Sequence, residues 1–323
     1  MQLPSALRAA VDTLLEEMPV SALKQAARTL SERYRAELRD GRLHMSGELA
    51  VKAYLATRLP ATFAAVRASL DAIVGARPDW SPQTLLDIGA GPGTVLWAAA
   101  DAWPELAHAT LLEASAPARH AGQYLARQLP LESDWISGDA TRDLPGLPQA
   151  DLVTCAYVLD ELEPAALSTL VERLWALTSD TLLIVEPGTP AGWRRILDCR
   201  SRLVAAGAHV IAPCPHHSPC PLAPPDWCHF SRRVARSRIH RLAKDADVPW
   251  EDEKFTYLAV SRHKPEDGRP AMRVLAPARG GSGKVELKLC RPDGTAATRL
   301  FTKRDGEMFK RARRTDWGDT LAE

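Results

Sequence analysis

Apolar residues recur every three or four positions through the first 78 residues of the chain. The spacing is clearest in three segments: VDTLLEEM, VSALKQAARTLSERYRAEL and ELAVKAYLATRLPATFAAVRASLDAIV. Apolar side chains at this spacing line one face of an α-helix. The pattern therefore predicts an N-terminal helical region over residues 1–78, which either packs on the rest of the protein or grips a substrate.

From about residue 79 to 190, short β-rich runs alternate with helical ones. The predicted strands are TLLDIG, ATLLEAS, DLVTCAYV and TLLIVE, and the predicted helices between and after them are GTVLWAAADAW, APARHAGQYLARQL and EPAALSTLVERLWALT. Alternation of this kind is typical of parallel βαβ units. A further helix (AGWRRILDCRSRLVAAG), a Pro- and Cys-rich loop over residues 212–230 and the strand candidate FTYLAVSRHK complete a predicted core domain, residues 79–269.

Beyond Pro270 the pattern changes again, to several short strand candidates separated by glycine turns. We expect a small β module over residues 270–323. The whole prediction is an α/β protein: a Rossmann-like class I methyltransferase sheet with an N-terminal helical region, a Cys-rich insertion and a small C-terminal β module.

Composition narrows the classes of function. A content of 46% hydrophobic and 25% charged residues in 323 is ordinary for a globular protein. The net charge of +1 excludes a polycation, so any nucleic-acid surface must be a local patch. No apolar run predicts a membrane span. The first 20 residues carry Asp12, Glu16 and Glu17 and resemble neither a secretion signal nor a transit peptide, so we expect a cytoplasmic location.

The segment DIGAGPGT, Asp87 to Thr94, follows an apolar strand and opens a helix. Gly89, Gly91 and Gly93 let the backbone turn sharply and approach a ligand, and the following helix offers oriented N–H groups. The spacing differs from the dinucleotide fingerprint G-x-G-x-x-G, and the preceding aspartate favours S-adenosylmethionine (SAM). NAD binding and a purely structural turn are the weaker alternatives.

Two acidic residues follow the next two strands in register with this loop. Glu113 ends the second strand, where a carboxylate can accept from both ribose hydroxyls. A further strand, the third in chain order, is expected to end near Gly138, which places Asp139 to accept from the adenine amino group. Together with Asp87 and the three glycines, they form the predicted cofactor site.

Fewer sequence features indicate catalytic residues. The fourth strand delivers Tyr157, Asp160 and Glu161 near the methyl donor, but the (Asn/Asp)-Pro-Pro-aromatic stretch typical of base amino methylation is missing. Cys155 lies in an apolar strand, which favours a buried, inert thiol over a nucleophile. The run from Glu186 to Gly188 either shapes a substrate mouth or ends the fifth strand. No catalytic residue is assigned.

Three cysteines share the Pro-rich loop, Cys214, Cys220 and Cys228, and Cys290 follows in VELKLCRPDG. Four thiolates suit zinc or an iron–sulfur cluster. Paired C-x2-C knuckles, typical of zinc ribbons, are absent, which favours a cluster. A mixed zinc site stays open because the loop also carries His216, His217 and His229. Unrelated loop thiols are the third reading, and Cys199 is expected to pack in a helix.

Residues 229–244 contain no acidic residue and six basic ones: Arg232, Arg233, Arg236, Arg238, Arg241 and Lys244. A second basic stretch, KRDGEMFKRARR, lies near the C-terminus. Because each stretch follows a predicted metal ligand, we expect a bound cluster to bring both onto one face that binds RNA phosphates. A solvated helix face is the alternative.

These segments together resemble one family, the mitochondrial small-ribosomal-subunit methyltransferase-like proteins and their bacterial relatives. The resemblance rests on LLDIGAGPGT, CAYVLDEL, VEPGTPAGW, APCPHHSPCPL with WCHF, and LCRPDG followed by WGD, over roughly residues 80–318. It implies a SAM-type core contacted through Gly89, Gly91, Gly93 and Glu113. It also implies a four-cysteine iron–sulfur (4Fe-4S) site on Cys214, Cys220, Cys228 and Cys290. The missing presequence suggests the bacterial branch.

The resemblance further implies association with the small ribosomal subunit during its assembly. The first functional hypothesis is therefore a SAM-binding, iron–sulfur-containing protein that acts in this assembly as an rRNA methyltransferase. Two alternatives remain: a non-catalytic assembly factor with a structural SAM pocket, and a small-molecule methyltransferase with a zinc clip. The sequence names no target nucleotide.

Overall fold

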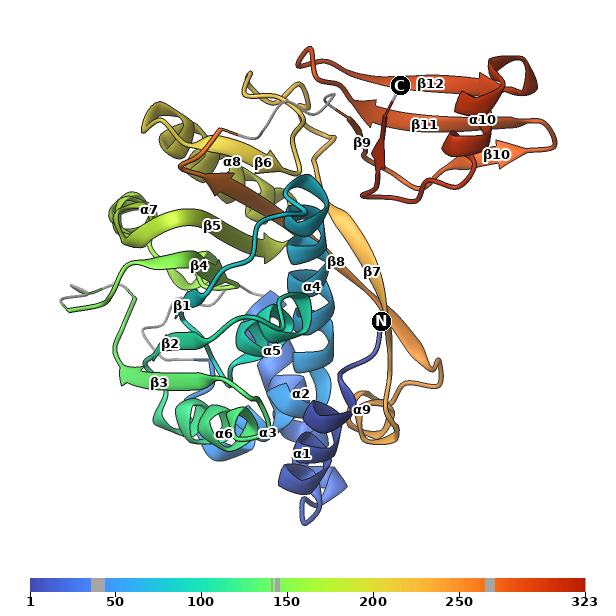
Figure 1. The fold of residues 1–323 in the computed structure, drawn as a ribbon. Helices are drawn as coiled ribbons and strands as arrows, with labels where there is room; N and C mark the ends of the chain where they lie inside the picture. The colour runs from blue at the N-terminus through green and yellow to red at the C-terminus, as the bar shows by residue number, and fades with distance from the viewer. Residues whose placement is uncertain (36–43, 141, 143–145, 265–270, 323) are drawn as a thin grey trace.

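The computed structural model describes residues 1–35, 44–140, 142, 146–264 and 271–322. Within these ranges an eight-stranded sheet forms the centre of the molecule (Figure 1). Its strands are β1 (Thr84–Ile88), β2 (His108–Glu113), β3 (Glu132–Ser137), β4 (Ala150–Ala156), β5 (Thr178–Pro187), β6 (His209–Ala212), β7 (Phe230–Ala235) and β8 (Trp250–Ser261). Their spatial order is β3-β2-β1-β4-β5-β8-β6, and β7 pairs with the first half of β8.

The first five strands are parallel, and β8 runs antiparallel to β5, from Thr181 opposite Ser261 to Pro187 opposite Phe255. The sheet grows in one direction from β1 through β2 and β3, and in the other through β4 and β5. The order therefore reverses beside β1, and ligands of such sheets bind at the carboxyl ends of the strands at this point. The strand order confirms the Rossmann-like methyltransferase class.

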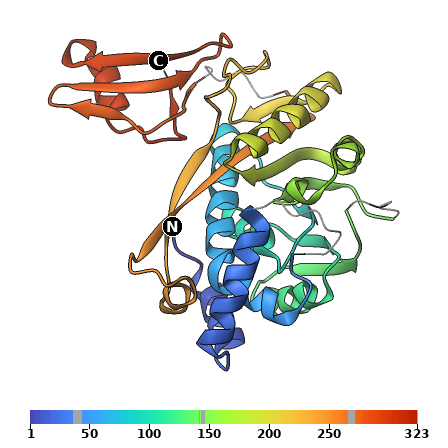
Figure 2. The ribbon, with the colours of Figure 1, turned by 180° about the vertical axis from the view of Figure 1, so that it is seen from behind.

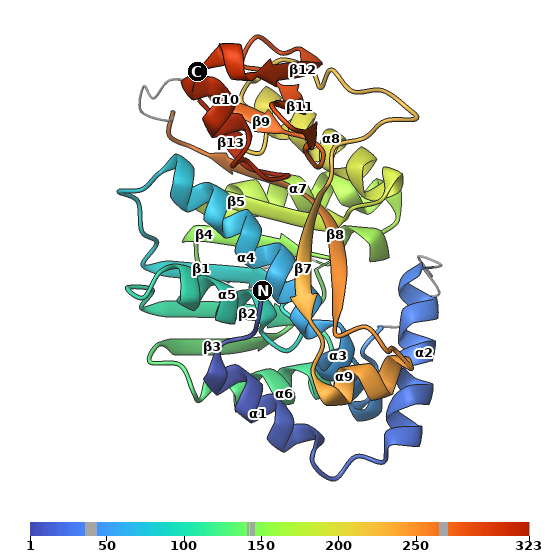
Figure 3. The ribbon, with the colours of Figure 1, turned by 90° about the vertical axis from the view of Figure 1, so that its right-hand side faces the viewer.

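Helices cover both faces of the sheet (Figure 3), because parallel strands buried on two sides must be screened from water. One face packs in a single apolar cluster against α4 (Leu59–Ala76), α5 (Thr94–Ala102) and α6 (Ala116–Ala126). The opposite face packs against α7 (Pro164–Leu177) and α8 (Pro190–Ala205). By length and composition alone, α4 is apolar enough to cross a membrane. Its Phe63, Leu70 and Ile73 are buried in the core, which accounts for its composition.

The N-terminal helices α1 (Ser5–Leu15), α2 (Val20–Arg35) and α3 (Glu48–Thr57) lie at the lower end of the molecule (Figure 2). They share a core with α4 and with α9 (Arg238–Lys244), a short helix in the β7–β8 connection. The N-terminal region is therefore bound to the sheet through two separate parts of the chain.

The C-terminal module is a second, smaller sheet with one helix. It contains β9 (Met272–Val274), β10 (Arg279–Gly281), β11 (Lys284–Cys290), β12 (Ala296–Thr302), β13 (Thr320–Leu321) and α10 (Glu307–Ala312). Leu287, Phe301 and Phe309 fill its own apolar core. This confirms the predicted small β module. Its predicted start, at residue 270, lies outside the described residues.

The predicted core strands are present, and FTYLAVSRHK falls in β8 as expected. Two strands escaped prediction. β6 is only four residues long, and β7 (FSRRVA) has just two buried positions, Phe230 and Val234, among its arginines. Neither gives a clear period-two pattern, since both are edge segments held by pairing with β8.

Candidate functional site

A cavity of about 280 Å³ lies at the carboxyl ends of β1, β2 and β4, where the strand order reverses. We call it the cofactor pocket. Its wall includes three of the predicted cofactor residues from the glycine loop and β2, Gly89, Gly91 and Glu113, and also Asp139 after β3. Four of the six predicted cofactor residues thus lie around one cavity, although they come from separate segments.

The glycine loop adopts a backbone that side chains disfavour. Gly89 has φ +75°, Gly91 +54° and Gly93 +78°. A Cβ atom on Gly89 would lie 2.4 Å from Cγ2 of Val158, and one on Gly91 would lie 3.1 Å from Cε of Met45. The positive φ and the close approach together require glycine at position 89. The loop leads directly into α5, so the N-terminus of this helix faces the pocket.

Glu113 holds the loop in place. Its Oε2 accepts from the Gly91 N–H at 2.8 Å, and its Oε1 accepts from the Ser115 N–H at 2.6 Å. Burial raises the pKa of this carboxyl, and the backbone hydrogen bonds oppose the rise. Each carboxylate oxygen retains acceptor capacity for a ligand hydroxyl. The residue can therefore organise the loop and bind a ligand simultaneously.

Asp87 and Gly93 do not lie on the pocket wall. The Asp87 side chain is buried beneath the loop, where Oδ1 accepts from Oγ1 of Thr154 at 2.7 Å. Burial raises its pKa to about 7. Gly93 packs against the indole of Trp135 instead. Both positions support the loop from behind, and their contact with a cofactor stays a prediction.

The N-terminal region forms one side of the pocket, which sequence reasoning missed. Tyr34, His44 and Met45 all line it. Oγ of Ser115 donates to the Met45 carbonyl at 2.6 Å, and the rings of Tyr34 and His44 lie 4.6 Å apart. No local motif marks these residues, because they reach the pocket only through packing of the helical region on the sheet.

The pocket floor carries the acidic turn after β4. Nε2 of His44 lies 3.6 Å from Oε1 of Glu161, and burial together with Asp160 raises the pKa of Glu161 to about 8. Tyr157 adopts the left-handed region with φ +57°, an uncommon state for a bulky residue. Its hydroxyl donates to Glu253 of β8 at 3.1 Å. Tyr157 and Glu161 therefore line the pocket, as expected for the donor end.

Other side chains near β4 and β5 are structural. Cys155 is buried, as predicted, and burial raises the pKa of its thiol well above the ordinary value, which supports the expected inert thiol. Cys199 is buried in α8, as predicted. Glu186 accepts from Nε of Arg195 at 2.6 Å and from the Leu159 N–H, and does not line the pocket.

A second cavity gathers the four cysteines predicted as metal ligands, Cys214, Cys220, Cys228 and Cys290. We call it the cysteine cavity. Three thiols come from the loop between β6 and β7 and the fourth from the end of β11, so the cavity joins the core to the C-terminal module. Burial raises the pKa of all four, for Cys290 to about 12. In the described part of the chain, no three His, Cys, Asp or Glu side chains meet closely enough for one metal ion.

The three nearby histidines have different roles. Nε2 of His216 lies 3.3 Å from Sγ of Cys290, inside the cavity. His217 is turned away and accepts from the Val210 N–H at 3.0 Å. His229 lies between two indoles, 4.7 Å from Trp227 and 4.9 Å from Trp317. This aromatic stack connects the cysteine loop to the C-terminal module.

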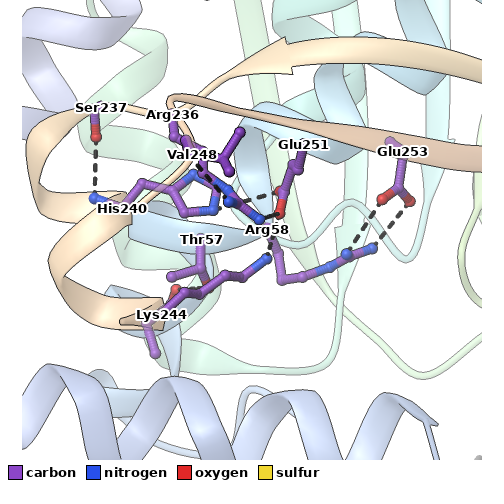
Figure 4. Close-up of polar contacts among 10 residues, drawn as sticks. Thr57, Arg58, Arg236, Ser237, His240, Lys244, Val248, Glu251 and Glu253 are labelled. Carbon is purple, nitrogen blue, oxygen red and sulfur yellow. Dashed lines mark hydrogen bonds and ion pairs between the residues drawn. The ribbon is translucent and has the colours of Figure 1, made fainter. Parts of the chain in front are cut away.

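The prediction of a one-signed basic face is wrong. β8 lies beside β7 and brings acidic residues against the arginines (Figure 4). Arg233 pairs with Asp252 at 2.9 Å, and Arg236 with Glu251 at 3.0 Å. Lys244 also reaches Glu251, at 2.9 Å, and Arg232 donates to the Trp317 carbonyl. Arg238 and Arg241 remain exposed on α9.

The helices that carry the two basic stretches lie at opposite ends of the molecule (Figures 1 and 3). α9 lies near the N-terminal helices at one end of the molecule, and α10 lies in the C-terminal module at the other (Figures 1 and 3). The linear sequence hid the acids because they lie on β8, after the α9 segment, and meet the arginines only through strand pairing.

Comparisons with known proteins show which sequences this chain is similar to. The family model described as mitochondrial small ribosomal subunit Rsm22 matches residues 48–322. The human mitochondrial ribosome assembly protein METTL17 is 32% identical over 290 residues, which cover 83% of this chain and 61% of that protein. Rsm22-cox11 tandem protein 2 of Schizosaccharomyces pombe is 22% identical over 326 residues, covering 83% and 42%. The chain thus spans about six-tenths or less of these relatives.

Among solved structures, an O-methyltransferase family protein from Burkholderia thailandensis is 15% identical with a TM-score of 0.46, covering 77% of this chain and 72% of that one. Magnesium protoporphyrin IX methyltransferase from Synechocystis with bound SAM is 15% identical with a TM-score of 0.43, covering 72% and 91%. The strand order carries the fold assignment independently of these scores. The family match extends over most of the chain, and the protein belongs to the mitochondrial small ribosomal subunit Rsm22 family.

Proposed function

We propose that this protein is a SAM-binding, iron–sulfur-containing factor that acts in assembly of the small ribosomal subunit. One observation carries the proposal: the fold places a cofactor pocket and a four-cysteine cavity in one chain of this family. The pocket lies on the sheet, whereas the cavity joins the sheet to the C-terminal module. The presence of both cavities supports a protein whose folded structure is held by two bound groups, one in each cavity.

SAM fits the cofactor pocket. A Cβ atom would close the cradle at Gly89, and the buried Glu113 carboxylate faces the same space. Gly89 and Gly91 would let the cofactor approach the backbone, Glu113 would accept from ribose hydroxyls, and Asp139 would accept from the adenine amino group. When bound, SAM supplies an electrophilic methyl group.

A 4Fe-4S cluster fits the cysteine cavity better than zinc does. A zinc ion needs four donors within about 2.0–2.3 Å of a single point. The thiols here share a cavity without meeting that closely. A cluster offers each thiolate a separate iron and so spans a wider set of ligands. Cys214, Cys220, Cys228 and Cys290 would hold it, and the C-terminal module would be fixed to the core.

Anaerobic purification followed by iron, sulfide and zinc analysis tests the metal assignment. We expect about four iron and four sulfide per chain for a single cluster of this type. Stoichiometric zinc without sulfide would refute the cluster. Calorimetric titration with SAM tests the pocket independently, and no binding to the cluster-loaded protein would refute that half of the proposal.

The C-terminal module supplies the RNA contact in this proposal. Residues 270–323 carry twelve Lys and Arg against seven Asp and Glu. Arg311, Arg313 and Arg314 are exposed at the end of α10. Phosphate neutralisation by such a group gives salt-dependent binding.

Charge reversal of Arg311, Arg313 and Arg314 to Glu should weaken binding to small-subunit RNA and flatten its dependence on salt. Each reversal is also made singly, and Arg233→Glu is the control for a single reversal, because this exposed arginine is already paired with Asp252. Filter binding across a salt series measures both effects. Equal losses in the single reversals and in Arg233→Glu would contradict the assignment of the contact to α10.

A second candidate function is methylation of rRNA by the same pocket. Tyr157 and Glu161 at the donor end support it. His44 and Met45 close one side of the cofactor pocket. A target nucleotide would have to displace them, which favours a non-catalytic assembly factor. Incubation of small-subunit precursors with methyl-labelled SAM separates the two. Labelled RNA establishes the enzyme, and no incorporation by cluster-loaded, SAM-binding protein refutes it.

A further inference from the structure

Two buried arginines line the cysteine cavity, one from the core and one from the C-terminal module. Arg200 extends from α8 and is 5% exposed, and Arg273 extends from β9 and is 7% exposed. Both line the cavity beside the four thiols. They come from the core and the C-terminal module respectively, so the cavity has one cation on each side of the junction.

Neither guanidinium has a carboxylate partner among the described residues. Arg200 donates through Nη2 to the carbonyls of His216 and Ser218, at 2.9 and 2.8 Å. Arg273 donates to the carbonyl of Pro213 at 2.9 Å and to that of Gly318 at 2.7 Å. Carbonyl oxygens satisfy N–H groups but carry no countercharge. Burying an unpaired cation is costly, so such groups are normally paired.

One donor is left over. Nε of Arg200 is buried and has no hydrogen-bond partner. A buried N–H without a partner costs free energy comparable to a lost hydrogen bond. The arrangement therefore contains two uncompensated positive charges and a spare donor, all beside four groups that become anionic when they bind a metal.

We propose that Arg200 and Arg273 are electrostatic positioning residues that balance the negative charge of a thiolate-bound cluster and raise its reduction potential. This inference rests on the proposed function, because it needs the cluster to be present. Four thiolates leave the assembled site with net negative charge, and reduction by one electron adds a further negative charge. A nearby fixed cation favours the reduced state, and local charge and hydrogen bonds to the sulfurs set such potentials.

The arginines also hold the ligand loop. Arg200 binds carbonyls at positions 216 and 218, between Cys214 and Cys220, and Arg273 binds the carbonyl immediately before Cys214. A purely structural role would be to hold this loop. The charge role and the loop role are separable, because lysine retains the charge but lacks the rigid, planar guanidinium, whose Nη2 donates to both carbonyls.

The test is a spectroscopic redox titration of the anaerobically purified full chain, with dithionite as the one-electron reductant. Arg200→Gln, Arg273→Gln and Arg200→Lys are compared with Arg202→Gln. Arg202 lies on the same helix, is more exposed and pairs with Asp198 at 3.0 Å, so it controls for loss of a positive charge from α8.

We expect each glutamine variant to shift the reduction equilibrium at least tenfold toward the oxidised state, which is about 59 mV for one electron. Arg200→Lys should retain a potential near that of the wild type, and Arg202→Gln should match it. If Arg200→Gln assembles no cluster while Arg200→Lys does, the result also supports the inference, because a positive charge at position 200 is then needed for the cluster to assemble. Unchanged potentials in both glutamine variants overturn the inference. A lysine variant as impaired as the glutamine variant also overturns it, because the geometry of the guanidinium then matters rather than its charge.

Failure of the proposed function gives a different result. If the wild-type chain contains no iron and sulfide, the cluster assignment fails before any variant is compared. If the wild type carries a normal cluster and the variants titrate identically, only the role of the arginines fails.

Discussion

The cofactor pocket and the cysteine cavity are built in opposite ways. The glycine loop and Glu113 of the pocket follow neighbouring strands of one sheet, within 25 residues of each other. The cavity draws on a loop, a helix and a second sheet, and its four cysteines span residues 214–290. A site at a sheet edge exists once the sheet forms. A site at a junction exists only while the core and the C-terminal module stay in contact. A group bound there would therefore also hold these two parts together.

The largest expected effect is at Cys290, the thiol that the C-terminal module supplies, because its loss should affect the cysteine cavity and leave the cofactor pocket intact. Cys290→Ser should remove most of the iron and sulfide and lower the melting temperature by several degrees, because a structural metal group stabilises the fold it joins. SAM affinity should change little. Metal analysis, thermal denaturation and SAM titration measure the three quantities.

Cys199→Ala is the control for Cys290→Ser, since this thiol is buried in α8 and does not line the cavity. Its iron content should equal that of the wild type. A Cys290→Ser protein that retains full iron would break the comparison, because the cavity would then not depend on the C-terminal module.

A smaller effect is expected at the glycine loop. Gly89→Ala forces a side chain into a positive φ and against Val158, and should lower SAM affinity more than tenfold while leaving iron content unchanged. Strain of this kind costs about 1–3 kcal/mol. Isothermal titration calorimetry and metal analysis give the two readouts.

Gly207→Ala is the control for Gly89→Ala, because it introduces backbone strain without a steric clash. Gly207 has φ +85° but open space around its missing Cβ, and it lies away from the cofactor pocket. It should lose stability without losing SAM affinity. Equal loss of SAM affinity in both alanine variants would mean that general destabilisation explains the effect.

The smallest effect concerns the support beneath the loop. Asp87 has a pKa of about 7 in the folded protein because it is buried, against about 4 in an unfolded chain. Its contribution to stability is full below about pH 4 and is lost as the pH rises to about 7, since the folded state binds the extra proton. Asp87→Asn should therefore make the fall in unfolding free energy between pH 5 and 7 less steep, by up to about one proton.

Denaturant unfolding at a series of pH values measures this slope. Asp252→Asn should leave it unchanged between pH 5 and 7, because the Arg233 hydrogen bond lowers the pKa of Asp252. If Asp87→Asn unfolds with the wild-type dependence on pH, the carboxyl is charged in the folded protein and the proposed burial effect is absent.

The sequence alone determined the parallel strands of the sheet and the glycine loop, because both depend on local patterns. Runs such as TLLDIG are apolar since parallel strands are buried on both faces, and Gly89 is required by its own backbone conformation. The cysteine spacing likewise indicated a shared site. The strands and the glycine loop are local in the chain, so local physical chemistry is sufficient to predict them, whereas Cys290 lies 62 residues beyond Cys228.

Only the tertiary structure decided what surrounds those features. In the folded chain Asp87 lies behind the loop, and His44 and Met45 line the cofactor pocket. Arg233 and Arg236 form ion pairs with acidic residues on β8. The fold also places Arg200 and Arg273 beside the thiols. Charges and packing partners act through space and depend on pairing between distant segments, and a linear reading of basic residues cannot show which of them are already neutralised.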